Sequence, residues 1–490
     1  MTVSLPDRYC QIMKEFLKED YPAWQDSFLA LPFKGIRIND LKIDAAAFAE
    51  LWERCGGREE NLEPIDWIPN GFFIKDTATF SSHPFYQAGL YYIQEPSAMT
   101  PAEILPVEPG NIVLDLCAAP GGKTTQLLAK LRGMGILYAN DISASRAKAL
   151  RKNVEMAGAA NAFVTAESPE KLAASFPGFF DRILVDAPCS GEGMFRRKPE
   201  MAGEWEERGP DYYAPLQREI LDKAAFLLAS GGLMAYSTCT FSELENEGSV
   251  EWLLGKHPEM EICNIPDYEG FLRSRVAGLH GCIRIMPHRM SGEGQFVCLM
   301  RKKGAAGDRL PVQWEAGDRL PVQRATKDRM LVERVARDNP LTKRAARGKT
   351  GNDGFSLYER GGQIYLLPGG HKIRPGIRYL MTGLYVGDQK SGKVRPSQAL
   401  AQALRAEEWS RVLNLPVGDG RLLRYLRGES IEYSKEEIVI QSETSDRVFG
   451  VKVEGLVGDI LILAEGFPVG FGAENRGILK NRRNPGWRIQ

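Results

Sequence analysis

Two cysteines are the first candidates for chemistry, because each follows an apolar segment that predicts a strand. Cys189 lies in the run Asp186-Ala-Pro-Cys-Ser-Gly-Glu-Gly after segment 182–186, and Cys239 lies in Ser-Thr-Cys-Thr after segment 233–237. In a doubly wound sheet, ligands bind at the carboxyl ends of the strands, so both thiols are expected at one rim. A thiol there can act as a nucleophile, or it can be a small buried apolar group, which is the usual state of a cysteine.

A glycine-rich turn precedes the two cysteines. The run Asp115-Leu-Cys-Ala-Ala-Pro-Gly-Gly-Lys123 ends one predicted strand and opens a helix. A ligand can approach such a backbone closely, but the spacing is neither that of a dinucleotide site nor that of a phosphate loop. Asp141 follows Gly121 by 20 residues and ends the next strand, where an acid can accept both ribose hydroxyls. These features indicate an adenosine ligand without a phosphate chain, such as S-adenosylmethionine; a tight turn with a helix-capping aspartate is the alternative.

The elements that must position these groups alternate between strands and helices. Segments 112–116, 135–140, 162–165, 182–186 and 233–237 read as strands with helical stretches between them. This alternation predicts an α/β fold with a doubly wound, mostly parallel Rossmann-like sheet. Two later segments, 283–286 and 295–301, predict a closing antiparallel hairpin. The sheet domain is therefore expected to span residues 96–302 and to end near Arg301.

The flanking segments differ in character. Residues 1–95 predict a small α+β module, 351–425 a second small α+β module, and 426–490 a β-rich module in which 456–472 forms two strands. In 303–350, Lys and Arg clearly outnumber Asp and Glu, and Ala-Gly-Asp-Arg-Leu-Pro-Val-Gln occurs twice. This segment predicts a basic linker, either a solvated tether or one that contacts RNA. The tail 476–490, which includes Arg482, Arg483 and Arg488, holds five positive charges and no acid.

The composition excludes several classes of protein. The 490 residues include 63 Lys and Arg and 63 Asp and Glu, so a nucleic-acid site must be a local patch. The eight cysteines include no Cys-x-x-Cys motif, so no disulfide scaffold and no metal site is predicted. The sequence shows no apolar signal core and no apolar run of membrane-spanning length, so we expect a cytoplasmic protein without membrane contact.

Three motifs, in this order, resemble the Sun/Fmu family of RNA (cytosine-5) methyltransferases: LDLCAAPGGKT, DAPCSGEG and YSTCT. QAGLYYIQEPSAM (87–99) and GCIRIMPHRMSGEG (281–294) are similar to its RsmF-like ribosomal RNA branch. GFPVGFG, followed by LKNRRNPGWR, resembles the PUA-like tail of that branch. The resemblance covers about residues 30–302 and 355–490. It implies a Rossmann-like methyltransferase sheet, a small N-terminal module and a C-terminal PUA-like RNA-binding module.

The resemblance also implies roles for single residues. Cys239 would be the nucleophile, Cys189 would help to release the product, and Asp186 would touch both the cofactor and the target base. Asp141 would bind the ribose of S-adenosylmethionine, and Glu167 would contact its adenine. The residues implied to hold the methionine part of the cofactor are Cys117, Ala118, Ala119, Pro120, Gly121, Gly122 and Lys123.

Three positions depart from the family pattern. Glu167 stands where an aspartate is more usual. The run Arg196-Arg-Lys198 lacks the aspartate that often follows Arg-Lys, which makes the expected RNA contact more basic. Gln295 stands where this branch often has a histidine.

The implied reaction forms 5-methylcytosine in ribosomal RNA, which we expect to be that of the small subunit. Carbon 5 of cytosine is a weak nucleophile, and addition of a thiolate at carbon 6 activates it. No histidine lies near Cys239 in sequence, so Arg, Lys or the base itself must help to ionise the thiol. A protonated Asp186 could donate a hydrogen bond to ring nitrogen 3 and stabilise the adduct. The cytosine must be unstacked, so single-stranded or loop RNA is the expected target.

Two alternatives remain open from the sequence. Transfer RNA is the alternative substrate, because the catalytic motifs do not exclude it. A non-catalytic RNA-binding assembly factor is the alternative class of protein, and the intact Cys239, Cys189 and Asp186 argue against it. A monomer is expected, and neither the target cytidine nor the number of modified cytidines follows from the sequence.

Overall fold

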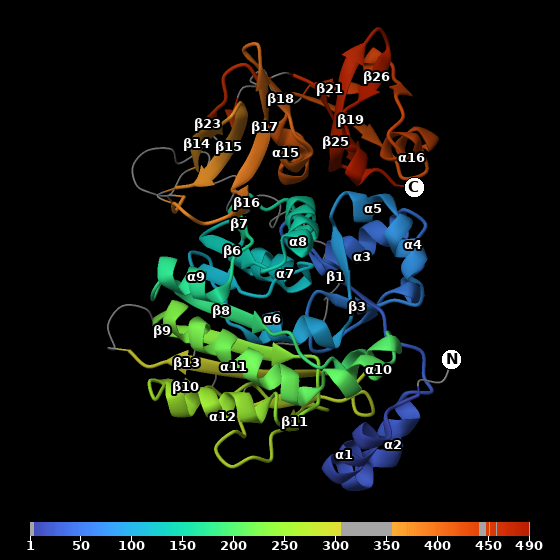
Figure 1. The fold of residues 1–490 in the computed structure, drawn as a ribbon. Coiled ribbons are helices and arrows are strands. Elements are labelled where there is room, and N and C mark those ends of the chain that lie inside the picture. Colours follow the sequence, from blue (N-terminus) through green and yellow to red (C-terminus); the bar gives the residue numbers. More distant parts are fainter. Residues whose placement is uncertain are drawn as a thin grey trace.

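The structure of the chain is a computed structural model. It describes residues 4–304, 355–369, 371, 373–440, 447–449, 451–456 and 458–489. The predicted basic linker 303–350, with its duplicated run, lies outside the described residues apart from its first two positions. Figure 1 shows a large central sheet, an N-terminal module in blue beside it, and the C-terminal sheets in orange and red above both.

Parallel strands form the middle of a ten-stranded sheet. In spatial order they are β9 (Leu228–Thr238), β8 (Phe180–Asp186), β5 (Ile112–Asp115), β6 (Ile136–Asn140) and β7 (Ala162–Thr165). The chain runs outward from β5 to β7 and then returns to β8 and β9 on the other side. The topological switch point therefore lies between β5 and β8, which is where such sheets bind ligands. This order confirms the predicted doubly wound sheet.

Helices cover both faces of this sheet because its strands are apolar on both sides. On β5, Val113 packs in the same buried cluster as Leu127, whereas Leu114 packs on the opposite face with Leu221. The helices on the two faces are α6 (Thr100–Ile104), α7 (Gly122–Leu131) and α8 (Ala144–Ala157) on the first, and α9 (Pro169–Ser175), α11 (Pro210–Leu227) and α12 (Glu247–Lys256) on the second.

Antiparallel strands extend both edges of the sheet. On one edge β12 (Ile283–Ile285) and β13 (Gln295–Lys302) form the predicted hairpin beside β9, with β10 (Met260–Ile262) and β11 (Leu272–Arg273) completing that edge. On the other edge β16 (Tyr379–Thr382) pairs with β7. The prediction that the sheet domain ends near Arg301 is therefore wrong. A strand beyond the linker belongs to the sheet, because its Met381 is buried in the sheet's own core.

The N-terminal residues form two separate parts. Tyr9 contacts the rings of Phe195 and Trp205, so the first two helices pack on the segment after β8. These helices are α1 (Asp7–Leu17) and α2 (Tyr21–Ser27), and the segment they contact includes α10 (Glu200–Glu207). The second part is a four-stranded sheet with three helices: β1 (Gly35–Ile38), β2 (Glu63–Pro64), β3 (Gly71–Phe73), β4 (Tyr91–Gln94), α3 (Ala45–Arg54), α4 (Thr77–Ser82) and α5 (Pro84–Gln87).

Two larger β-sheets and one short strand pair follow the linker. The first sheet holds β14 (Phe355–Arg360), β15 (Gln363–Pro368), β17 (Leu384–Lys390) and β18 (Lys393–Pro396), with α15 (Gln398–Ala403) after it. The second holds β19 (Arg411–Leu415), β20 (Ile431–Glu432), β21 (Ile438–Ile440), β24 (Ile460–Ala464), β25 (Phe467–Asn475) and β26 (Ile478–Asn481), with α16 (Gly420–Leu426). The short pair is β22 (Arg447–Val448) and β23 (Val451–Lys452). The strand pair predicted within 456–472 is confirmed as β24 and β25.

The second of these sheets shares its core with the N-terminal module. Phe85 of α5 and Tyr425 of α16 belong to one buried cluster, and α16 lies above α5 in Figure 1. Arg483, which the sequence places among the charges of the tail, is 1% exposed. Its guanidinium donates hydrogen bonds to the side chain of Gln87 and to two C-terminal carbonyls. Arg483 therefore joins the two modules and is not a surface charge available to RNA.

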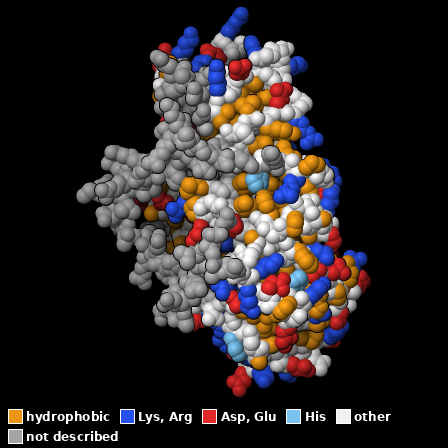
Figure 2. Space-filling model, turned by 90° about the vertical axis from the view of Figure 1, so that its left-hand side faces the viewer, with side chains coloured by type: hydrophobic (Ala, Val, Ile, Leu, Met, Phe, Trp, Pro, Cys, Tyr) orange, Lys and Arg blue, Asp and Glu red, His pale blue; other side chains and the backbone are white. Residues whose placement is uncertain are grey.

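The described surface carries charges of both signs. On the face drawn in Figure 2, Lys and Arg side chains are interspersed with Asp, Glu and apolar ones wherever described residues are visible. Among the described helices, none combines the length and the apolar character that a bilayer span requires.

Candidate functional site

The residues singled out by sequence lie along one rim of the central sheet. From β7 to β9 the strand ends carry Glu167, Asp141, Asp115, Asp186 and Cys239 in that spatial order. The carboxyl ends of parallel strands meet at one edge of a sheet, which is why residues so far apart in sequence are neighbours.

A cavity of about 280 Å³ opens at the middle of this rim. Sequence reasoning had singled out several of its lining residues, namely Cys117, Ala118, Ala119, Pro120, Gly122, Lys123, Asp186, Cys239 and Gln295. Gly121, Asp141, Glu167 and Cys189 border this region but do not line the cavity. Asp115 and Arg197 also line the cavity, and both lie in runs that had been singled out from sequence. Lining residues that were not expected include Lys34, Tyr92, Gln94 and Glu95 of the N-terminal module together with Glu293. The runs 87–99 and 281–294 contain four of these five residues, but they suggested no role from sequence.

Two glycines shape the turn, and a side chain at either position would crowd its neighbours. Gly121 has a φ of +114°, and a β-carbon on it would lie 3.1 Å from the side chain of Leu150. A β-carbon on Gly122 would lie 3.1 Å from the side chains of Tyr92 and Gln94. The glycines therefore let α7 begin directly against α8 and β4. The first of them has the left-handed backbone that glycine adopts most readily.

The two thiols are in contact, with 3.4 Å between the sulfurs of Cys189 and Cys239. The hydrogen bond with Cys239 and burial together raise the pKa of Cys189 well above its ordinary value. Burial likewise raises the pKa of Cys117, which lines the same cavity. Cys189 and Cys117 are therefore held as neutral thiols.

Asp186 is held by three donors. Lys123 Nζ donates to Oδ2 at 2.8 Å, while Ser237 Oγ and Gln295 Nε2 donate to Oδ1 at 2.7 and 3.2 Å. The carboxyl group is therefore an acceptor in this arrangement, and the donor role toward a bound base that was expected from sequence stays a prediction. Gln295, noted as a departure from the family pattern, is one of the groups that hold it.

Lys123 brings a positive charge to the cavity. Its side chain is 12% exposed. Burial alone would lower its pKa, but the charge and hydrogen bond of Asp186 outweigh that effect and raise the pKa, and Cys239 adds a smaller contribution in the same direction. Lys123 is therefore a cation at neutral pH, and it is the basic group near Cys239 that the sequence could not identify.

Asp115 is fully buried beneath the glycine turn. Its Oδ2 accepts a hydrogen bond from Thr124 Oγ1 at 2.6 Å, whereas its Oδ1 has no partner among the described residues. Burial raises the pKa of Asp115 to about 7. A buried acceptor without a partner at the cavity wall is suited to a donor on a bound ligand.

The two outer acids have partners of their own. Asp141 accepts a hydrogen bond from Ser143 N at 2.9 Å and pairs with Arg146 at 3.3 Å. Glu167 Oε1 accepts hydrogen bonds from Lys171 Nζ at 2.8 Å and from the backbone N–H of Arg378 at 2.5 Å. The hydrogen bond from Arg378 N links Glu167, which is predicted to contact adenine, to the segment that carries β16.

The basic run after Phe195 is divided between interior and surface. Arg196 is 5% exposed in its side chain and pairs with the buried Glu293 at 2.8 Å, so it is not the RNA contact expected from sequence. Arg197 and Lys198 are exposed, and Arg197 lines the cavity.

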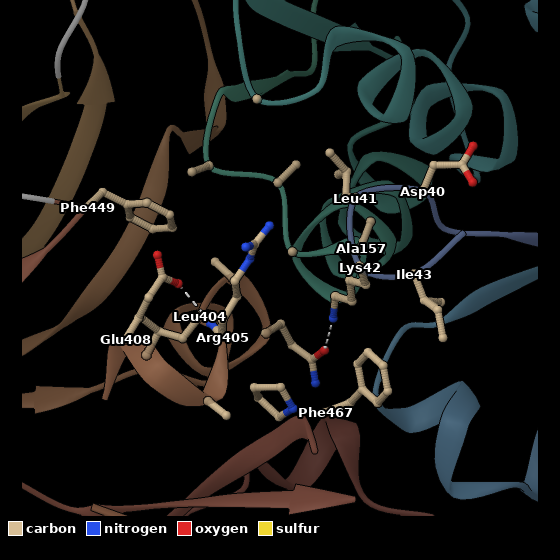
Figure 3. A pocket seen from close by; sticks show the side chains of 18 of the residues that line it. Asp40, Leu41, Lys42, Ile43, Ala157, Leu404, Arg405, Glu408, Phe449 and Phe467 are labelled. Carbon is tan, nitrogen blue, oxygen red and sulfur yellow. Dashed lines mark hydrogen bonds between the residues drawn. The ribbon is translucent and has the colours of Figure 1, made fainter. Parts of the chain in front are cut away.

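A larger cavity, of about 380 Å³, lies away from the thiols. It lies between the loop after β1, the end of α8 and the C-terminal segments (Figure 3). At its wall Lys42 Nζ donates to Gln402 Oε1 at 2.8 Å and to the carbonyls of Ala88 and Met156 at 2.6 and 3.2 Å. Because its ammonium group already has three acceptors, Lys42 connects different parts of the chain at this wall.

Glu192, on the loop after Cys189, supplies a test of stability against pH. Its carboxylate accepts hydrogen bonds from Trp205 Nε1 at 3.0 Å and Phe241 N at 2.8 Å, and burial raises its pKa from 4.5 to about 7. The folded protein thus favours the protonated acid, so stability should fall as the pH rises from about 4.5 through 7. The side chain in Glu192→Gln cannot ionise, so the stability of this variant should fall less over the same pH range. Melting temperatures of both proteins at pH 5 and pH 8 check this, and parallel pH profiles would contradict it.

Comparison with family models and known proteins gives the following similarities. Residues 102–301 match 16S rRNA methyltransferase RsmB/F, residues 5–96 match the N-terminal domain of 16S rRNA methyltransferase RsmF, and residues 349–404 match the RsmF rRNA methyltransferase first C-terminal domain. Ribosomal RNA small subunit methyltransferase F of Cronobacter sakazakii is 36% identical over 315 residues, covering 61% of this chain and 64% of that protein. The protein of the same name from Escherichia coli strain K12 is 36% identical over 317 residues, with 62% and 64% covered.

Solved structures agree on the fold. A methyltransferase homolog protein from Pyrococcus horikoshii aligns with a TM-score of 0.51 at 28% identity, covering 58% of this chain and 91% of that one. The central sheet thus has the Rossmann-like methyltransferase fold, with an N-terminal module and a β-rich C-terminal region. The PUA-like character of residues 426–490 stays a prediction. The match spans 64% of the two curated relatives, so their full activity does not transfer by similarity alone.

Proposed function

We propose that this chain, whose residues 102–301 match 16S rRNA methyltransferase RsmB/F, is an S-adenosylmethionine-dependent enzyme that forms 5-methylcytosine in small-subunit ribosomal RNA. One observation carries the proposal. The ion pair of Lys123 and Asp186 lies in the same cavity as Cys239, whose sulfur is 3.4 Å from that of Cys189. A thiol that can ionise, a cation and a neutral second thiol are the groups that covalent activation of cytosine needs.

The residues of the cavity fit S-adenosylmethionine. Asp115 Oδ1, which has no hydrogen-bond partner among the described residues, suits the ammonium of the methionine part, next to the backbone of the turn 117–123. Asp141 and Glu167, farther along the rim, are proposed to hold ribose and adenine. When bound, the cofactor supplies an electrophilic methyl group.

We propose that Cys239 Sγ adds to carbon 6 of the cytosine. Lys123 stabilises the thiolate by its positive charge, which interacts with Cys239. Asp186, an acceptor, takes a hydrogen bond from the exocyclic amino group of the base. After carbon 5 has received the methyl group, water takes up the proton of carbon 5 and the electron pair of that C–H bond restores the ring double bond. The sulfur–carbon bond breaks, and its electron pair returns to Cys239 Sγ. Cys189, held neutral beside Cys239, is suited to give a proton to the departing sulfur.

A methyl-transfer assay tests the proposed function. Full-length protein, tritium-labelled S-adenosylmethionine and small-subunit ribosomal RNA lacking the modification should yield labelled 5-methylcytidine after digestion. Transfer RNA and DNA serve as comparison substrates and should accept far less label. Label on another atom, or preferential labelling of transfer RNA, would overturn the substrate or the chemistry proposed here.

Cofactor affinity should depend on Asp141. Asp141→Ala removes the acceptor proposed for ribose and should weaken binding of S-adenosylmethionine by roughly 1.5–3 kcal/mol, the scale of hydrogen bonds to a charged group. This corresponds to about a ten- to hundredfold loss of affinity. Calorimetry without RNA measures it. Ser143→Ala, which removes the adjacent helix cap to Arg146, is the matched control and should change affinity little. Equal affinity in Asp141→Ala and wild type would remove Asp141 from the site.

A further inference from the structure

Each reactive thiol lies on a loop of its own. A carboxylate on the loop of Cys239 accepts hydrogen bonds from the loop of Cys189. The loop after β9 carries Cys239 and, farther on, Glu245. Glu245 Oε2 accepts a hydrogen bond from Ser190 N at 3.0 Å, and its Oε1 accepts one from Ser190 Oγ. Ser190 directly follows Cys189. The position of Cys189 is thus set by a carboxylate that belongs to the loop of Cys239.

The reverse contact also exists. Glu192, on the loop after Cys189, accepts a hydrogen bond from Phe241 N, two residues beyond Cys239, at 2.8 Å. Gly193 N donates to the carbonyl of Cys239 at 2.8 Å. A β-carbon on Gly193 would lie 2.9 Å from that carbonyl oxygen, so the two loops are packed as closely as their backbones allow.

Both carboxylates are buried, Glu245 with 0% and Glu192 with 3% of its surface exposed. Burying a carboxyl group costs free energy unless hydrogen bonds compensate it. Each group accepts hydrogen bonds from the opposite loop and one more from a helix, from Gln217 for Glu245 and from Trp205 for Glu192. Neither Glu192 nor Glu245 lines the cavity, so neither touches a substrate there. Their hydrogen bonds connect the two loops and thereby influence the distance between the sulfurs of Cys189 and Cys239.

We propose that Glu192 and Glu245 are positioning residues that form a reciprocal carboxylate clamp. Each of them lies on one cysteine loop and accepts hydrogen bonds from the other cysteine loop. Glu245 positions Cys189 through Ser190, and Glu192 positions Cys239 through Phe241. The inference rests on the proposed function, because it assigns the two thiols to different steps of one covalent reaction. Loss of the two contacts should therefore give different defects.

The test measures the covalent RNA–protein adduct on denaturing gels beside the turnover rate. Glu245→Ala frees Ser190 and displaces Cys189, so release should slow: turnover should fall about tenfold while adduct accumulates. Glu192→Ala displaces Cys239 instead, so turnover should fall without adduct. Glu245→Gln keeps an acceptor for Ser190 N and should restore release. Glu243→Ala, an exposed position on the same loop, is the matched control.

Ser190→Ala is a milder second variant, because it removes only the hydroxyl contact with Glu245. It should accumulate less adduct than Glu245→Ala but more than wild type. If Glu245→Ala does not fold, Ser190→Ala and Glu245→Gln decide the question. A fall in turnover without adduct in Ser190→Ala or Glu245→Ala, while Cys189→Ala does accumulate adduct, would overturn the clamp. If Cys189→Ala itself forms no adduct, the proposed covalent function fails instead.

A measurement without RNA separates the two failures further. In a glutathione buffer, Cys189 and Cys239 reduce oxidised glutathione to two thiols as they form a disulfide, and mass spectrometry gives the equilibrium. Loss of the clamp in Glu245→Ala should lower that equilibrium constant about tenfold, a potential shift of about 30 mV for a two-electron couple. Equal constants in wild type, Glu245→Ala and Glu243→Ala would show that Glu245 does not set the spacing of the thiols.

Discussion

Cys239→Ala should abolish methyl transfer and adduct formation, whereas Cys189→Ala should trap the protein on its RNA. The sulfur of Cys239 is the proposed nucleophile, and neither neighbouring thiol can replace it, because burial raises the pKa of both Cys189 and Cys117 even without Cys239. Without Cys189, the adduct still forms through Cys239, but its release lacks a proton donor 3.4 Å from the departing sulfur. We expect no detectable turnover in either variant, because a nucleophile and its partner act as a unit.

A denaturing gel of protein incubated with RNA and S-adenosylmethionine separates the two outcomes. Cys189→Ala should give a shifted band, and Cys239→Ala and the double variant should give none. Cys263→Ala is a suitable control, because this partly buried cysteine lies outside the cavity. A shifted band that persists without Cys239 would show that the roles of the two thiols are reversed.

Asp186→Asn should lower the rate of methyl transfer about a hundredfold or more, the scale of losing a preorganised polar contact in an active site. The substitution removes the charge that keeps Lys123 protonated, and burial then lowers the pKa of Lys123 with only the smaller contributions of Cys239 and Asp115 against it. The thiolate of Cys239 loses its cation, and the base loses an acceptor. The pH at which activity rises should therefore shift as well.

Ser237→Ala provides the comparison, because it removes one hydrogen bond to Asp186 and leaves the ion pair with Lys123 intact. Its rate should fall far less than that of Asp186→Asn. Single-turnover rates at saturating cofactor, measured across pH 6 to 9, give both quantities. A wild-type rate and pH profile in Asp186→Asn would exclude the carboxylate from the chemistry.

The C-terminal region contributes to the site in a way that its charge did not suggest. The segment beyond the linker supplies β16 to the central sheet and the backbone N–H of Arg378 to Glu167. A chain ending near Arg301 would therefore lose the edge strand β16 and the backbone N–H that holds Glu167. Arg196 and Arg483 likewise looked like surface charges for RNA, yet both are buried in ion-pair or hydrogen-bond contacts between segments.

What the sequence determined by itself is the doubly wound sheet and the strand ends that carry Asp141, Asp186, Cys189 and Cys239. Both follow from local patterns, because strand and helix periodicities, glycine turns and short motifs are properties of neighbouring residues. What only the tertiary structure decided is which groups meet there: Gln295 with Asp186, Glu245 with Ser190, and the edge strand β16 with β7. Such contacts join residues far apart in the chain, and they depend on packing and burial, which leave no local pattern in sequence.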